Sequence, residues 1–251
     1  MDGHDTVVLV IGNTRLHWGW FRDTFLEGVW HTGHLIKDIS PDDAPDFLPE
    51  ILARLLRRET RVLIASVVDK QTQLWGGYQA VREITLKDVN LAGLYKGMGI
   101  DRALALWGGA STHGYPCLVI DAGTALTITG VDAQKVLVGG AILPGLRTQF
   151  DSLSQKTAAL PSISLPHNLP SLWATNTGGA MEAGIIYSVL GGVSYHVREW
   201  LARFPDSAVI ITGGDGEYLE RYLREYDRAL ASKIILDDKV IFWGTLQCLL
   251  D

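Results

Sequence analysis

The feature that most constrains the fold is a segment that occurs twice, once in each half of the chain. The stretch LVIGNTRLHWGWF aligns with VIDAGTALTITGV when Gly12 is placed on Gly123, and Val10 then falls on Asp121. Each copy predicts a buried strand, a small turn and a returning strand. A chance match is the alternative, but the order of elements after each copy is also similar. The repeat predicts two similar α/β halves with turns on facing edges and a ligand-binding cleft between them.

The spacing of apolar residues predicts the remaining elements. In the first half we expect two or three strands in 6–32, a helix within 41–60 that includes Phe47 and Leu48, a strand at 61–68, a helix at 70–81, a strand at 83–86 and a helix from Asp101. In the second half we expect strands at 117–120, 125–131, 135–143, 208–212 and 233–236 and helices at 146–158, 177–203, 217–228 and 242–251. This order is that of a mixed α/β protein with domains at 1–113 and 114–251.

Composition and charge exclude several classes of protein. With 251 residues, 47% of them hydrophobic, the chain can build one large core or two smaller ones. The net charge is −6 and the basic residues cluster only in the short run 54–61, which disfavours nucleic-acid binding. No apolar run approaches the roughly 20 residues of a membrane span. Cys117 and Cys248 lie in apolar runs and are expected to be buried free thiols, so we predict a cytoplasmic protein.

The first turn, IGNT at 11–14, has the composition of a phosphate cradle. Gly12 would allow a positive φ and a close approach of the backbone to a ligand. Asn13 and Thr14 offer hydrogen-bond donors. A plain hairpin turn is the alternative.

The second turn, DAGTALT at 121–127, gives the strongest local indication of ligand binding. Asp121 ends a buried strand, which is costly unless another group pairs with the carboxylate. Gly123 permits close backbone approach, and Thr124 and Thr127 supply hydroxyls. These groups suit a nucleotide phosphate together with a cation. The alternative is an Asx turn in which Asp121 only caps its own backbone.

The stretch GMGIDRALA, 97–105, places Asp101 and Arg102 at the start of a helix. An N-cap would explain the aspartate but not the adjacent arginine or the flanking glycines. A carboxylate that accepts a hydroxyl proton beside an arginine that holds a charged substrate would serve phosphoryl transfer.

Several weaker patterns accompany these motifs. The glycine turns GGAILPG at 139–145 and ITGGDG at 211–216 follow strands and could let a nucleotide pass closely. Thr177 opens a helix, either as its cap or beside donors that attract a carboxylate. The seven histidines show no metal-ligand spacing, and His17 and His196 are expected to be packed.

Taken in order, these residues resemble the type III pantothenate kinase family of the acetate kinase/sugar kinase/Hsp70/actin superfamily, whose members have duplicated ribonuclease-H-like domains. The resemblance covers nearly the whole chain. It rests on IGNT at 11–14, SVV at 66–68, GIDR at 99–102, DAGTALT at 121–127, GGAILPG at 139–145, AALP at 158–161, Thr177 with Gly184, and TGG at 212–214.

The resemblance implies a function and a set of site residues. The family transfers a phosphoryl group from ATP to the hydroxyl of pantothenate, the first step of coenzyme A synthesis, and its members are dimers. By resemblance Asp101 is the general base and Asp121 holds a monovalent cation, K⁺ or NH₄⁺. The residues implied to hold pantothenate are Tyr95, Gly99, Ile100, Arg102 and Thr177, and those implied to contact ATP are Gly12, Asn13, Thr14 and Thr124.

One position departs from the family pattern Asp-x-Gly-Asn-Thr. Val10 stands where the family has an aspartate near the phosphates and Mg²⁺. Asp5 would lie roughly 16 Å away along the strand and is no substitute. Because Mg²⁺ keeps several waters and can be held largely by ATP oxygens, we expect activity to be retained.

Two other readings stay open. The chain could be a non-catalytic member that binds nucleotide or pantothenate, like the Bvg accessory factor, which acts in transcriptional regulation. It could also be a kinase or phosphatase of the same superfamily that acts on a sugar. The presence of Asp101 and Arg102 favours catalysis, and GIDR and ILPG favour pantothenate over a sugar by family resemblance.

Overall fold

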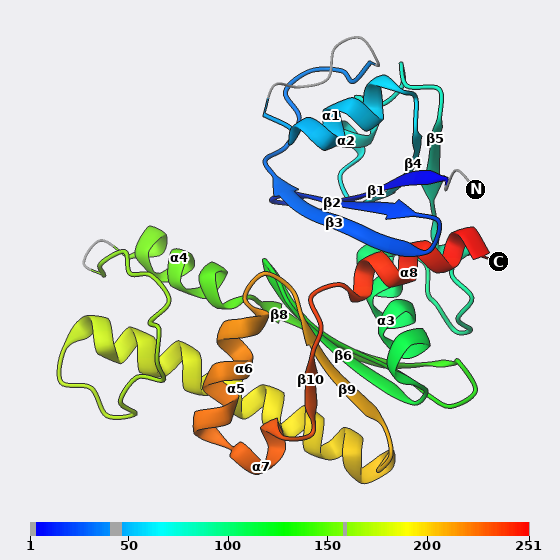
Figure 1. Ribbon diagram of the computed structural model, residues 1–251. Coiled ribbons are helices and arrows are strands. Elements are labelled where there is room, and N and C mark those ends of the chain that lie inside the picture. The colour runs from blue at the N-terminus through cyan, green and yellow to red at the C-terminus, as the bar shows by residue number, and fades with distance from the viewer. Residues whose placement is uncertain (1–3, 41–46, 158–159, 251) are drawn as a thin grey trace. The chain divides into compact units, whose positions relative to one another are not determined.

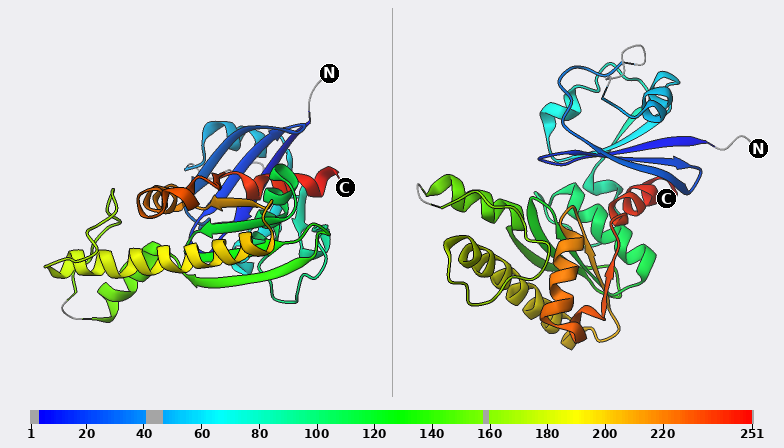
Figure 2. Two further views of the ribbon diagram at one scale, coloured as in Figure 1. Left: turned by 90° about the horizontal axis from the view of Figure 1, so that it is seen from below. Right: turned by 60° about the vertical axis from the view of Figure 1, so that its left-hand side comes forward.

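The computed structural model describes residues 4–40, 47–157 and 160–250. The chain packs as two compact units (Figures 1 and 2). Unit 1 comprises Met1–Asn90, Leu94–Gly108 and Ile241–Asp251, and unit 2 comprises Leu91–Gly93 and Gly109–Val240. The C-terminal segment therefore belongs with the N-terminal half. The domain limits expected from the sequence, 1–113 and 114–251, stay a prediction.

Unit 1 is built on a mixed sheet with the strand order β3-β2-β1-β4-β5. The strands are β1 (Asp5–Ile11), β2 (Leu16–Arg22), β3 (Phe25–Thr32), β4 (Arg61–Ser66) and β5 (Val81–Ile84). β1, β2 and β3 pair antiparallel, whereas β4 pairs parallel with both β1 and β5. Its helical elements are α1 (Glu50–Arg57), α2 (Asp69–Gln73), the 3₁₀ helix η1 (Leu86–Asp88), the first part of α3 (Ile100–His113) and nearly all of α8 (Val240–Leu250).

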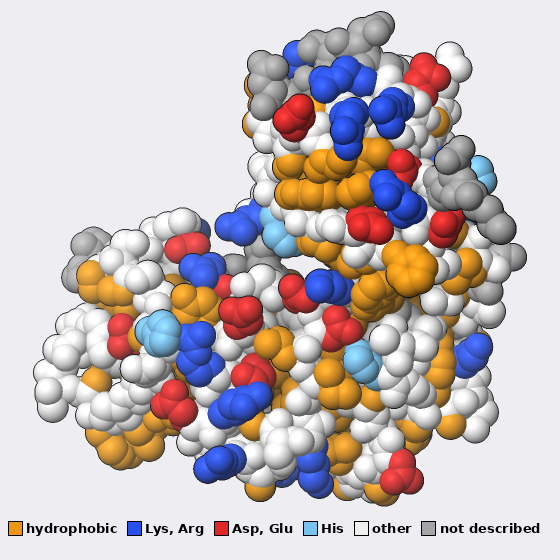
Figure 3. All heavy atoms as spheres, viewed as in Figure 1, with side chains coloured by type: hydrophobic (Ala, Val, Ile, Leu, Met, Phe, Trp, Pro, Cys, Tyr) orange, Lys and Arg blue, Asp and Glu red, His pale blue; other side chains and the backbone are white. Residues whose placement is uncertain are grey.

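The sheet of unit 1 is covered on both faces, which explains the continuous apolar sequence of β1. On one face, alternate residues of β1 pack in a common core with Leu52, Leu55 and Leu56 of α1. Burying each leucine contributes about 1.5–3 kcal/mol. On the other face, a Cβ atom at Gly19 of β2 would lie 2.7 Å from the ring of Phe242 in α8. The close packing of α8 on β2 therefore requires a glycine at this position of the strand. Figure 3 shows Lys and Arg side chains gathered over α1, which matches the exposed basic run 54–61.

Unit 2 repeats this plan with the strand order β10-β9-β6-β7-β8. Its elements are β6 (Cys117–Ala122), β7 (Ala125–Val131), β8 (Leu137–Pro144), α4 (Leu146–Lys156), α5 (Thr177–Arg203), β9 (Ala208–Thr212), α6 (Gly216–Tyr226), α7 (Arg228–Ala231) and β10 (Ile234–Leu236). The long helix α5 contributes Ile186, Leu190 and Val197 to the core of this unit. The ring of Trp200 occupies the space that a side chain at Gly130 would need, since a Cβ atom there would lie 2.4 Å away.

The two sheets have the same topology when β1 is matched with β6, β2 with β7, and so on through β5 and β10. This correspondence confirms the predicted α/β class with two similar halves. Cys117 and Cys248 are buried free thiols, as expected. None of the helices in the described part of the chain has the length and apolar character of a bilayer span.

Two helices differ from the sequence prediction. The helix expected over 70–81 is only α2, because the chain turns at Gly76 and Gly77 and enters β5 at Val81. The helix expected to include Phe47 and Leu48 begins after them, with Pro49 at the N-cap of α1. Proline cannot donate a backbone hydrogen bond and is suited to this position at a helix start. Leu48 is nevertheless buried, which accounts for its place in the apolar pattern.

Candidate active site

The first turn joins β1 to β2 at residues 12–15. The Gly12 N–H donates to the Arg15 carbonyl (3.0 Å), and His34 Nε2 donates to the Gly12 carbonyl (2.9 Å). Asn13 and Thr14 are exposed. The expectation of a positive φ at Gly12 is wrong, because Gly12 is not among the glycines with φ above zero. A Cβ atom at Gly12 would make ordinary contacts, 3.4 Å from the Arg15 carbonyl oxygen and 3.8 Å from His17 Nε2.

The position of the missing acid lies in a row of side chains that crosses the sheet. Val10 is paired with His17 across β1 and β2, and His17 is paired with His31 across β2 and β3. Directly opposed residues lie on the same face of a sheet. Val10 is only 2% exposed, and the Nδ1 atoms of the two histidines are 2.9 Å apart. We expected both His17 and His196 to be packed. His17 is half-buried and contacts His31, but His196 is exposed, so the expectation is wrong for His196.

Asp101 is the second residue of α3, so it lies inside the helix and is not its N-cap. Its Oδ1 accepts a hydrogen bond from the Arg102 N–H (2.8 Å). Burial raises the pKa of the Asp101 carboxyl above its ordinary value, although the Arg102 N–H and guanidinium oppose this shift. A carboxylate with a raised pKa is a stronger base, as a proton acceptor requires.

The first turn and the start of α3 meet at one edge of the unit 1 sheet. Val67, just after β4, donates its N–H to the Ile11 carbonyl (3.1 Å). A Cβ atom at Gly99 would lie 3.9 Å from Val67 Cγ1 and 2.4 Å from Asp101 Oδ1. A side chain at Gly99 would therefore displace the carboxylate. The motifs IGNT, SVV and GIDR come together here because β1 and β4 run parallel and end side by side.

Tyr95 contacts Arg102, the residue that follows Asp101 in GIDR. Arg102 Nη1 donates to the Tyr95 hydroxyl (3.0 Å), and Tyr95 is half exposed. Ile100 is only 7% exposed. The sequence prediction that Tyr95 and Arg102 act at one place is consistent with this contact.

In unit 2, Asp121 is the residue before the last of β6 and lies between two threonines of the neighbouring strands. It is paired with Thr127 on β7 and with Thr212 on β9. Gly213 has a φ of +90°, and a Cβ atom there would lie 2.3 Å from Asp121 Oδ1, so this position requires glycine. The Thr124 carbonyl accepts hydrogen bonds from Gly145 N (2.9 Å) and Thr148 Oγ1 (2.7 Å), which fixes the second turn.

Sequence reasoning missed an ion pair next to the second turn. Arg147 Nε lies 2.7 Å from Asp215 Oδ1, and this contact raises the pKa of Arg147. Asp215 is buried, and its N–H donates to the Ala122 carbonyl (2.9 Å). The motif ITGGDG contains Asp215 and could have indicated it, but its partner lies 68 residues away in the sequence.

Thr177 is the first residue of α5 and is exposed. The alternative that Thr177 caps this helix is wrong, because the N-cap is Asn176, whose side chain accepts from Gly179 N (2.8 Å). Within the described ranges, no three His, Cys, Asp or Glu side chains are grouped so that they could hold a metal ion. Of the AALP motif, residues 158–159 lie outside the described residues.

Comparison with known proteins decides the family. The profile of the type III pantothenate kinases matches residues 6–199. The chain belongs to the type III pantothenate kinase family. Among type III pantothenate kinases, that of Nostoc sp. is 41% identical over 253 residues, covering 95% of this chain and 92% of the relative. That of Synechocystis sp. is 43% identical over 238 residues, covering 94% and 87%.

Solved structures show the same fold at low identity. A conserved putative Baf family transcriptional activator from Campylobacter jejuni has a TM-score of 0.63 at 19% identity, covering 97% of both chains. The activator of the 2-hydroxyisocaproyl-CoA dehydratase from Clostridium difficile, with bound ADPNP, has a TM-score of 0.56 at 15% identity, covering 98% of this chain and 93% of that one. This pantothenate kinase family member therefore shares its fold of two similar α/β units with both of these proteins.

Proposed function

We propose that this protein transfers the γ-phosphoryl group of ATP to the hydroxyl of pantothenate. The observation that carries the proposal is Asp101, a half-buried carboxylate with a raised pKa that lies beside the first turn in a chain of the type III pantothenate kinase family. A non-catalytic protein has no need of a base at this position. The sugar kinase alternative lacks a comparable observation in its favour.

In this proposal Asp101 accepts the proton of the attacking hydroxyl as the new O–P bond forms. Burial gives the carboxylate its basicity, and the hydrogen bond from Arg102 N–H holds Oδ1 in place. Arg102 and Tyr95 bind the charged end of pantothenate, together with Gly99, Ile100 and Thr177. Positioning of the hydroxyl and neutralisation of charge supply most of the catalysis that phosphoryl transfer needs.

Gly12, Asn13, Thr14 and Thr124 bind ATP in this proposal. ATP oxygens hold most of the coordination of Mg²⁺, which neutralises phosphate charge. Asp121 holds K⁺ or NH₄⁺, because its carboxylate oxygen is a hard ligand. A monovalent cation there supplies a positive charge near the phosphates.

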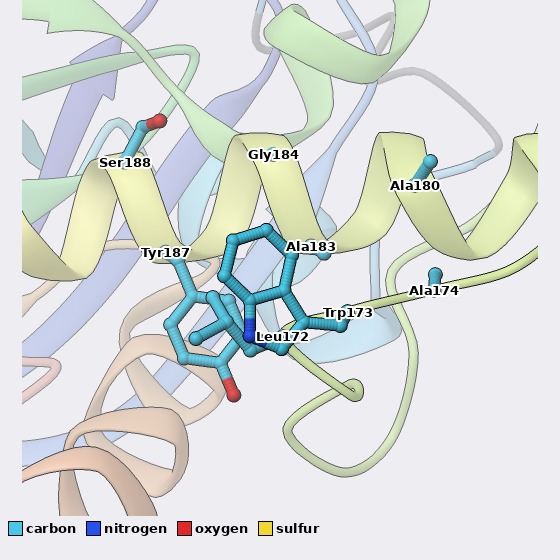
Figure 4. A pocket seen from close by; sticks show the side chains of 8 residues that line it. All are labelled: Leu172, Trp173, Ala174, Ala180, Ala183, Gly184, Tyr187 and Ser188. Carbon is cyan, nitrogen blue, oxygen red and sulfur yellow. The ribbon is translucent and has the colours of Figure 1, made fainter.

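We further propose a cytoplasmic homodimer. Around the first half of α5, Trp173 is 86% exposed and Leu172 is 50% exposed. These residues border a pocket of about 460 Å³, shown in Figure 4 with the rings of Trp173 and Tyr187 near α5. The pocket is lined by Leu172, Trp173, Ala174, Ala180, Ala183, Gly184, Tyr187 and Ser188. Exposed apolar surface of this kind is typical of a protein–protein contact.

The test is to incubate the purified protein with ATP, Mg²⁺ and K⁺ and with pantothenate or a panel of sugars, and to identify products by mass spectrometry. We expect phosphorylated pantothenate and no sugar phosphate. A sugar phosphate would indicate the other kinase class. If the folded protein binds ATP and yields no product, the non-catalytic alternative holds.

A further inference from the structure

The row formed by Val10, His17 and His31 lies where the family pattern places an acid, and it holds a polar group of a different kind. His17 is opposite Val10 in the register, so both side chains are on the same face at the end of the strand. The His17 Nε2 atom faces the first turn, 3.8 Å from the position that a Cβ atom of Gly12 would occupy. This imidazole therefore lies on the face of Val10 and beside Gly12.

The contact with His31 restricts the protonation state of His17. The two Nδ1 atoms are 2.9 Å apart, and the rings meet edge to face with centroids 4.8 Å apart. One Nδ1 must carry the proton and the other must accept it. If His31 donates, a neutral His17 carries its proton on Nε2, which then becomes a donor that points toward the turn.

The surroundings favour an anion beside this nitrogen. Burial, together with the neighbouring His31 and Arg15, lowers the pKa of His17 to about 4. The cationic Arg15 in the turn contributes positive potential beside His17. The Gly12 carbonyl already accepts a hydrogen bond from His34 Nε2, so it does not need His17 Nε2 as a donor. Val10 adds no negative charge that would draw a second proton onto His17.

We propose that His17, oriented by His31, binds a phosphate group of the nucleotide through its Nε2–H, in place of the Mg²⁺-directed acid that the family carries at position 10. This inference rests on the proposed function insofar as the phosphate belongs to ATP. The site contacts the nucleotide with a neutral donor, whereas a carboxylate at the same position would contact it only through a cation.

The test compares two substitutions, each of which places an amide near the position of one of the two ring nitrogens. The amide of His17→Gln reaches the Nε2 position, and the amide of His17→Asn reaches the Nδ1 position. The affinity for ADP and for a non-hydrolysable ATP analogue is measured by calorimetry with and without Mg²⁺, and kinetics give the KM for ATP and for pantothenate. A lost hydrogen bond to a charged group weakens binding about tenfold or more.

We expect His17→Asn to bind both nucleotides about tenfold more weakly with or without Mg²⁺, His17→Gln to stay within about threefold of wild type, and KM for pantothenate not to change. His196→Ala, at an exposed histidine of α5, is the control and should bind like wild type. Equal nucleotide affinities for His17→Asn, His17→Gln and wild type would overturn the inference, as would a loss seen only with Mg²⁺. If wild type binds nucleotide but does not phosphorylate pantothenate, the proposed function fails. The nucleotide affinities of the His17 variants then still decide the inference about His17.

Nitrogen NMR of the histidine rings gives a second, independent readout. We expect a neutral His17 with its proton on Nε2 and a change in that resonance when ADP is added. A proton on Nδ1 of His17, with Nε2 as an acceptor, would contradict the proposal.

Discussion

The turn after β1 and the turn after β6 stand at matching places in the two sheets but differ in length and in side chains, since residues 12–15 form the first turn and residues 123–124 the second. Gly12 N–H donates to the Arg15 carbonyl at 3.0 Å, and Gly123 N–H donates to the Ala125 carbonyl at 3.2 Å. Two residues before each glycine, the first turn has Val10 and the second has Asp121. The two turns therefore allow a direct comparison of an apolar and an acidic residue at matching places.

The neighbours change together with this residue. Asp121 lies between Thr127 and Thr212, whose hydroxyls can stabilise a carboxylate, whereas Val10 lies between Ala65 and His17. A buried charge needs polar partners, and an apolar residue does not. The comparison indicates that a duplicated fold can keep its strand topology while a whole row of side chains is exchanged.

The largest effect is expected from a substitution of the proposed base, Asp101, which belongs to neither turn. Asp101→Asn keeps the shape of the side chain but removes the base, so we expect kcat to fall about a thousandfold. Nucleotide affinity and the thermal unfolding midpoint should stay near wild type. Near-normal turnover by this variant would contradict the role of Asp101.

The glycines of the two halves should respond very differently to substitution. Gly213→Ala forces an L residue to φ +90° and places Cβ 2.3 Å from Asp121 Oδ1 and 2.7 Å from the Ala122 carbonyl carbon. We expect a loss of about 3 kcal/mol in the free energy of unfolding by urea. Gly12→Ala, which meets only ordinary contacts, should cost less than about 1 kcal/mol. Equal losses in the free energy of unfolding for the two variants would contradict this difference between the glycines.

The acid of the second turn should govern the response to monovalent cations. We expect Asp121→Asn to raise the K⁺ concentration for half-maximal activity about tenfold, because a neutral amide is a weaker ligand than a carboxylate. The measurement is a K⁺ and NH₄⁺ titration of the initial rate. Asp206→Asn, at an exposed position of the same unit, is the matched control. If wild-type activity is independent of both cations, Asp121 has another role.

The smallest effect is expected in the pH dependence of stability, to which His17 beside the first turn contributes. The pKa of His17 in the folded protein is about 4, below its ordinary value of 6.5. The unfolded chain therefore binds a proton that folded His17 does not, and stability is lost as the pH falls from 6.5 to 4. We expect His17→Gln to remove about 1 kcal/mol of this decline after allowance for solvent screening. His196→Gln should keep it, and a decline unchanged in both variants would contradict the assignment.

The comparison also shows what the sequence can predict. Strand and turn positions followed from apolar patterns and glycines, so the repeat, the limits of α5 and the placement of Asp101 at a helix start were correct. The ion pair of Arg147 with Asp215 was not predicted, because it depends on how α4 and α6 approach the second turn. The pairing of His17 with His31 was not predicted either, since it needs the register of three strands, which periodicity does not fix.

The most direct test of the central claim is to compare wild type with Val10→Asp in a steady-state assay of pantothenate phosphorylation, with ATP varied at saturating Mg²⁺. The account predicts that wild type turns over and that Val10→Asp changes kcat/KM for ATP by no more than a few fold, because the first turn binds phosphate without an acid. An inactive wild type together with an active Val10→Asp variant would contradict it, and would show that the chain lacks an acid that the reaction requires.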